Sequence, residues 1–235
     1  LAYGVLVGAG QFGLLYTAMN GHIAPGLASL VIQTQVFFTI GLSMATSGER
    51  LKFFQVVALL LATGGLVLVG THTDGQTTPQ GLLMVLVAAA CWAAGNIVAR
   101  RAQGTSSLAY VVWSSFGAVP PLAILAWLLE GPQALTQALR HADGMAWAAM
   151  LWQTVGNTLF GYGAWGWLLQ RHAAATVVPW ALLVPVFGMA SAVVLLQEPM
   201  PWWKVTAAAM VIGGLALNLL WPLIYSRMAP LPKVG

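Results

Sequence analysis

Amide and aromatic side chains inside the apolar stretches of this sequence are the groups with the chemistry to contact a ligand. Gln153, Asn157 and Gly161 recur every four residues, which places them on one face of a helix. Trp92 and Asn96 share that spacing on another helix. Amides donate and accept hydrogen bonds without carrying charge. The two faces therefore predict the lining of a polar but uncharged site.

Gln33 and Gln35 are a second pair of candidate lining residues. They are two positions apart, about 200° around an α-helix, so at most one is expected to point squarely at a central path. An alternative role is structural, because amides also bond neighbouring membrane helices, at about 0.6 to 2 kcal/mol each. For Gln33, Asn96 and Asn157 the lining and the structural roles both stay open.

Four further aromatic residues, Trp113, Tyr162, Trp165 and Trp180, are candidates for contact with a cation. An aromatic face attracts an ammonium group by about 0.5 to 2 kcal/mol. Packing between helices is the more common role of such rings. We include all four among the candidate substrate-binding residues.

Prolines inside apolar stretches predict hinges. Pro185 lacks the N–H that would bond the carbonyl of Ala181, and Pro179 has the same effect on the carbonyl of Ala175. Pro120 and Pro121 interrupt a second stretch in the same way. A freed carbonyl can bind a substrate ammonium, but a hinge is the role that we expect.

Ionisable residues are absent from the depth of every apolar stretch. His22, His72, His141 and His172 fall in loops or at expected helix ends, as do all five acidic residues. We expect Glu198, at a helix end, to stabilise the neighbouring helix start rather than to couple transport to protons. A site without fixed charge suits a neutral or zwitterionic small molecule.

Several function classes are excluded by what the sequence lacks. It has no HExxH, GxSxG or Walker A motif and no carboxylate cluster at depth, so we expect no enzyme, no metal and no cofactor. The nine Lys and Arg residues form no basic stripe, which argues against nucleic acid as a partner. The expected partners are membrane lipid and a small-molecule substrate, and the oligomeric state stays open.

The elements that must position these residues are membrane-spanning helices. Only 6% of residues are charged, 59% are hydrophobic, and the mean hydropathy is +0.82. A bilayer core needs about 20 apolar helical residues per crossing. We predict an all-α, polytopic integral membrane bundle whose spans lie near residues 2–20, 25–46, 52–71, 80–101, 107–129, 145–169, 174–197 and 202–223.

The distribution of basic residues predicts the orientation. Both chain ends and the loops with Arg50, Arg100 and Arg171 fall on one face, which carries all basic residues except Arg140 and Lys204. By the positive-inside rule this face is cytoplasmic. The tail, residues 224–235, is then cytoplasmic in a multi-pass protein.

An internal repeat of inverted topology is visible in the sequence. The spacing from Glu49 to Gly64-Gly65-Leu66 equals that from Glu198 to Gly213-Gly214-Leu215. The two copies are offset by five helices, so corresponding helices cross in opposite directions. The expected domains are residues 1–73, three helices of a first repeat, and residues 80–223, a second repeat of five. We expect two upstream helices to be missing and the chain to be truncated at its N-terminus.

Four segments carry a family resemblance. The runs PGLASLVIQTQVFFTIGLSMATSGERL from Pro25, CWAAGNIVAR from Cys91, GYGAWGWLLQR from Gly161 and VVPWALLVPVFGMASAVVLLQE from Val177 resemble the EamA-type drug/metabolite transporters. The resemblance is greatest to the cysteine and O-acetylserine exporters of bacterial inner membranes. It implies ten helices in two inverted halves of five.

The resulting functional hypothesis is a secondary transporter of the bacterial inner membrane. It exports small neutral or zwitterionic, amino-acid-like metabolites by alternating access, which is the natural use of inverted repeats. Alternatives are an exporter of other drugs or metabolites in the same superfamily, or a passive small-solute channel. A channel is expected to show a filter loop or rings of like side chains, and the sequence shows neither.

Overall fold

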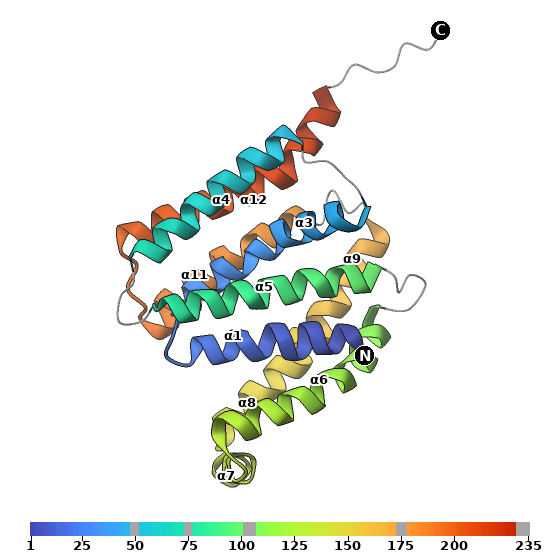
Figure 1. Ribbon diagram of the computed structural model, residues 1–235. Coiled ribbons are helices and arrows are strands. Elements are labelled where there is room, and N and C mark those ends of the chain that lie inside the picture. The colour runs from blue at the N-terminus through green and yellow to red at the C-terminus, as the bar shows by residue number, and fades with distance from the viewer. Residues whose placement is uncertain (48–51, 73–76, 101–106, 173–177, 229–235) are drawn as a thin grey trace.

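The computed structural model describes residues 1–47, 52–72, 77–100, 107–172 and 178–228. All regular structure in these residues is helical, as predicted (Figure 1). Labels beginning with η mark 3₁₀ or π turns. In chain order the elements are η1 (Gly4–Gln11), α1 (Phe12–Met19), α2 (Pro25–Val31), η2 (Ile32–Thr34), α3 (Gln35–Ser47), α4 (Phe53–Thr71), α5 (Pro79–Arg100), α6 (Ser107–Glu130), α7 (Ala134–His141), α8 (Gly144–Leu151), η3 (Trp152–Gly161), α9 (Tyr162–Arg171), η4 (Val178–Leu182), α11 (Leu183–Leu196) and α12 (Trp202–Met228).

Length and apolarity identify this chain as a polytopic membrane protein. Five helical segments in the described ranges are long and apolar enough to cross a bilayer: Pro25–Thr46, Phe53–Thr71, Pro79–Ala99, Val112–Glu130 and Trp202–Tyr225. Two shorter apolar helices are Gly4–Met19 and Trp180–Leu196. The number of spans that we predicted, eight, therefore remains a prediction, although the consecutive helical pieces follow the predicted ranges closely.

Departures from α-helical geometry divide several predicted spans. η1 and η3 are π-helical, whereas η2 and η4 are 3₁₀ turns that come directly before α3 and α11. Pro179 lies in η4 and Pro185 in the first turn of α11. Because proline cannot donate a backbone hydrogen bond, the η4 break follows from the sequence, but η2 has no proline to signal it.

α4 and α12 pack side by side in antiparallel directions (Figure 1). Phe54, at the start of α4, stacks near Trp221 toward the end of α12, with ring centroids 6.4 Å apart. A β-carbon on Gly65 would lie 2.9 Å from the carbonyl oxygen of Ala207, and one on Gly214 would lie 2.6 Å from that of Ala58. These glycines therefore set the close approach of the two helices.

The buried centre of the bundle is built around α2. Leu27, Ala28, Leu30 and Val31 are fully buried, and α2 packs against α11 on one side and α5 on another. Many large apolar side chains on the outer helices are exposed instead, among them Leu128 on α6. Lipid is the environment that suits such a surface.

Candidate functional site

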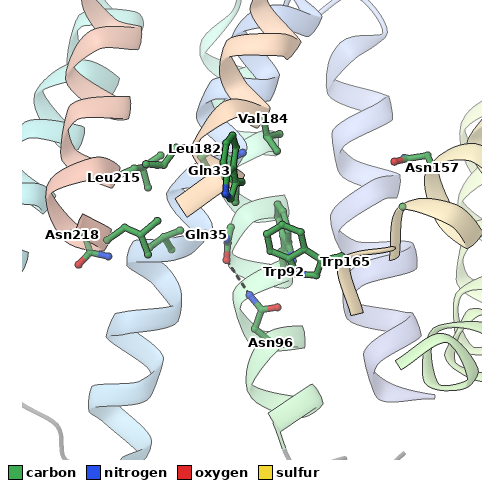
Figure 2. Close-up of a pocket in the computed structure, with 15 residues that line it drawn as sticks. Gln33, Gln35, Trp92, Asn96, Asn157, Trp165, Leu182, Val184, Leu215 and Asn218 are labelled. Carbon is green, nitrogen blue, oxygen red and sulfur yellow. Dashed lines mark hydrogen bonds between the residues drawn. The ribbon is translucent and has the colours of Figure 1, made fainter. Parts of the chain in front are cut away.

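A cavity of about 620 Å³ lies where the irregular turns meet the long helices (Figure 2). η2, α3, α5, η3, α9, η4, α11 and α12 all contribute to its wall. The lining residues are Gln33, Gln35, Val36, Trp92, Asn96, Asn157, Gly161, Trp165, Trp180, Ala181, Leu182, Val184, Leu215, Asn218 and Leu219. The structure thus brings together Gln33, Gln35, Trp92, Asn96, Asn157, Trp165 and Trp180 from the predicted set.

Gln35 and Asn96 are joined by a hydrogen bond across two helices. The Asn96 amide nitrogen donates to Gln35 Oε1 at 3.0 Å, and the Thr39 hydroxyl donates to the same oxygen at 3.3 Å (Figure 2). This contact links α3 to α5. Both amides therefore line the cavity and also connect helices, so the two roles left open by the sequence coexist for Asn96.

Gln33 lines the same cavity as Gln35, contrary to the expectation that only one of them would face a central path. The physical reason is the 3₁₀ turn Ile32–Thr34, in which residues are about 120° apart instead of about 100°. Two steps then separate the side chains by about 120° rather than about 160° around the axis. Gln33 is 6% exposed and has no side-chain hydrogen bond with the described residues.

Gln153 is not among the cavity-lining residues, unlike Asn157 and Gly161. Its amide nitrogen donates to the hydroxyl of Tyr16 at 3.2 Å, and its Oε1 accepts from Asn157 at 3.3 Å. The predicted helical face is thus divided between cavity and packing. No pattern in the sequence indicates that Tyr16 on α1 is the partner of Gln153.

Aromatic residues at the cavity are Trp92, Trp165 and Trp180. Trp113 was predicted to join them, but it is 72% exposed on α6, beside Phe116 with ring centroids 5.8 Å apart. The structure therefore does not bring Trp113 to this cavity, because its helix turns this side outward, and its role in substrate binding stays a prediction. The side chain of Tyr162 lies outside what the structure describes.

The predicted hinge prolines fall into two groups. Pro179 and Pro185 flank Ala181 and Leu182, which line the cavity, and Pro185 is fully buried. Pro120 and Pro121 lie inside α6, which continues through both of them, and neither lines the cavity. Only the first pair is placed where a hinge would move the wall of the cavity.

Asn218 lines the cavity and was missed in the sequence. It comes from α12, one turn after Leu215 and next to Leu219 (Figure 2). Its Oδ1 atom is buried without a hydrogen-bond partner. The sequence contains one sign of this residue's role, because Asn218 interrupts the apolar run from Ala207 to Trp221. No second polar residue lies one turn away, so the sequence does not indicate a polar helix face there.

A buried ion pair lies at the end of the bundle where α11 meets α12. The Lys204 ammonium is 3.0 Å from Glu198 Oε1, and Glu198 Oε2 accepts a 3.0 Å hydrogen bond from the backbone N–H of Gly26. Lys204 is 0% exposed and Glu198 is 8% exposed. We expected Glu198 to stabilise the helix start that follows it in the chain, but its carboxylate caps α2, which is far away in the sequence.

The cavity itself has no ionisable side chain among its described lining residues. The described part of the chain also contains no group of three or more His, Cys, Asp or Glu residues placed to hold a metal. What the site offers is hydrogen bonding from amides and three indole rings on an otherwise apolar wall. This combination can bind and orient a small polar molecule.

A family model described as the EamA-like transporter family matches residues 79–220. The chain belongs to the EamA-like transporter family. This EamA-family chain is 37% identical over 225 residues to a "Probable amino-acid metabolite efflux pump" of Salmonella typhimurium, covering 93% of the chain and 75% of that protein. It is 36% identical, with the same coverage, to a protein of that name from Escherichia coli.

A more distant relative of this EamA-family chain is a "Probable terminal-alkyne amino-acid exporter" of Streptantibioticus cattleyicolor. The two are 24% identical over 200 residues, which cover 83% of the chain and 64% of that protein. No solved structure matches the chain. The relatives are thus named for efflux or export of amino-acid compounds.

Proposed function

We propose that this transporter exports small neutral or zwitterionic, amino-acid-like metabolites such as cysteine or O-acetylserine across the bacterial inner membrane. The observation that carries the proposal is the cavity lined by amides and indoles without an ionisable side chain. A lone anion or cation would find no counter-charge there, whereas a zwitterion brings its own. The names of the relatives support the same substrate class.

Alternating access between two inverted repeats is the mechanism that we propose. Its support is a pair of equivalent contacts between α4 and α12: Gly65 packs on Ala207, and Gly214 packs on Ala58. In the alignment of the two repeats, Gly65 corresponds to Gly214 and Ala58 corresponds to Ala207. Such exchange of partners is expected across a two-fold axis. The π turns η1 and η3 also stand at matching places in the two copies.

The topology proposed for this mechanism has eight spans in this chain. The match of the family model to residues 79–220 supports a second repeat close to residues 80–223. Residues 1–73 then belong to the first repeat. The positive-inside rule supports a cytoplasmic C-terminus and places Glu198 toward the outer side.

Transport by purified protein in liposomes tests the function. Liposomes loaded with unlabelled O-acetylserine or cysteine are expected to accumulate the labelled compound by exchange, and the uptake is expected to saturate. A channel would show neither saturation nor stimulation by internal substrate. That result would identify the alternative function.

Gln33→Ala is the first variant for this assay. We expect about a tenfold or larger loss of exchange, because an unpaired cavity amide is removed and a hydrogen bond to a charged group is lost. Gln137→Ala is the matched control, since Gln137 is an exposed amide on α7 outside the cavity. Equal exchange by both variants at equal protein amounts would contradict the role of Gln33.

A further inference from the structure

Five amide side chains line the cavity, and they differ in whether their hydrogen bonds are already made. Gln35 and Asn96 bond each other, and Asn157 donates to Gln153. Gln33 and Asn218 have no side-chain hydrogen bond with the described residues. These two amides therefore have N–H donors that are not already used in bonds with the described residues.

Asn218 is the more informative of the two, because its Oδ1 is buried without a partner. An unsatisfied buried polar atom costs about 1 to 3 kcal/mol, so its presence needs an explanation. The helix scaffold does not require an amide here: in the repeat register Asn218 aligns with Val69, which is fully buried on α4. Packing against α4 therefore does not account for an amide at this position, and its place on the cavity wall points to a role toward a ligand.

The orientation of Asn218 indicates which part of a ligand it meets. Oδ1 is buried, and in Figure 2 it points away from the other labelled lining residues, whereas the amide nitrogen, a donor, points toward them. Leu215 and Leu219 flank it on α12. An N–H donor in apolar surroundings binds a carboxylate strongly, because the hydrogen bond is charge-assisted and poorly screened.

We propose that Asn218 binds the carboxylate of the substrate and so selects amino acids that carry a free carboxylate together with an ammonium group. This inference rests on the function proposed above and specifies its substrate class. A neutral amide holds the carboxylate without supplying positive charge. The ammonium must therefore come from the substrate itself, so simple anions and dicarboxylates are excluded.

The test compares Asn218→Leu and Asn218→Asp with the unaltered protein in the liposome exchange assay. Asn218→Leu keeps the side-chain size and removes the donor, so the KM for O-acetylserine is expected to rise about tenfold. Asn218→Asp places a negative charge against the substrate carboxylate and is expected to raise the KM further. The same variant is expected to improve inhibition by serinamide, a cation whose carboxylate is blocked.

Gln11→Leu is the matched control, because Gln11 also has a buried, unpartnered Oε1 but does not line the cavity. Its KM is expected to equal that of the unaltered protein. Gel filtration and thermal melting show which variants fold. Asn218→Ser replaces any variant that does not fold. Serine keeps a small hydrogen-bond donor, so its KM is expected to be intermediate.

Three outcomes overturn the inference in distinguishable ways. An unchanged KM in Asn218→Leu removes Asn218 from the binding site while leaving the proposed function intact. A lower KM for O-acetylserine in Asn218→Asp assigns the residue to the ammonium end instead. Absence of exchange of either amino acid by the unaltered protein overturns the proposed function and this inference together.

Discussion

At the scale of single residues, Lys204 and Glu198 form a buried ion pair. The two charges can be buried away from water because they neutralise each other and because Glu198 also accepts a hydrogen bond from the Gly26 N–H. Neither charge faces the cavity. The pair therefore stabilises the join between α2 and the hairpin of α11 and α12 rather than binding substrate.

Removing either charge alone is expected to destabilise the protein by about 3 to 5 kcal/mol, because the other charge is left buried and unpaired. Glu198→Gln and Lys204→Met are the two variants, measured by unfolding in detergent. The double variant is expected to be more stable than the sum of the two single effects predicts. If the effects of the two single variants simply add in the double variant, the pairing is contradicted. Lys52→Met is the control, because Lys52 is exposed, and it should change the free energy of unfolding by less than about 0.5 kcal/mol.

Individual site residues were predictable where polarity stood out on a helical face. Asn96, Asn157 and Trp92 were found in this way and line the cavity. Gln153 shares the predicted face but does not line the cavity, because a periodic pattern gives a face without saying which neighbour that face meets. Trp113, named for its aromatic ring alone, does not line the cavity either. Only the folded chain shows that Tyr16 binds Gln153 and that Trp113 turns outward.

At the scale of elements, the antiparallel contact of α4 with α12 depends on two glycines. A methyl group on Gly214 would approach the Ala58 carbonyl oxygen to 2.6 Å, a separation at which the backbone must shift. Gly214→Ala is therefore expected to destabilise the protein by about 1 to 3 kcal/mol, the usual cost of overpacking. Thermal unfolding of the purified protein measures this.

Gly41→Ala is the control for that prediction, since a β-carbon there meets nothing within 4 Å. Alanine is the better helix former by about 1 kcal/mol, so Gly41→Ala should be neutral or stabilising. Equal effects at both positions would show that close packing at Gly214 is unimportant.

The limits of the helices were predictable because apolar runs and bilayer thickness fix them. The turns η2 and η3 were not, since a short change to 3₁₀ or π geometry leaves the hydrophobic pattern of a fully apolar stretch unaltered. η2 mattered most for the site, because it turns Gln33 and Gln35 toward one cavity.

At the scale of the whole molecule, the proposed orientation is open to direct measurement. Cys91 is the single cysteine, so Cys91→Ser gives a background for labelling. In that background, Gln137→Cys on α7 is expected to react with an impermeant maleimide in intact cells. His172→Cys, at the end of α9, should react only after permeabilisation, because both residues are exposed but lie at opposite ends of the bundle.

Labelling of both cysteines from the same side would overturn the inverted arrangement. Lys204, the obvious reporter from the sequence, is unsuitable for this measurement because it is fully buried. Family membership and the all-helical class were thus predictable from the sequence, whereas the choice of accessible positions required the folded chain.

Glu198 and Lys204 belong to one hairpin, while the N–H that Glu198 accepts belongs to α2. When the proposed repeats separate at the outer side, the carboxylate and the ammonium travel as one electroneutral unit. The hydrogen bond from Gly26 would be lost, at about 1 to 3 kcal/mol, together with the packing of α2 on α11. In the proposed mechanism the ion pair would stay intact during this separation, so no unpaired charge would be exposed to lipid at this end of the bundle.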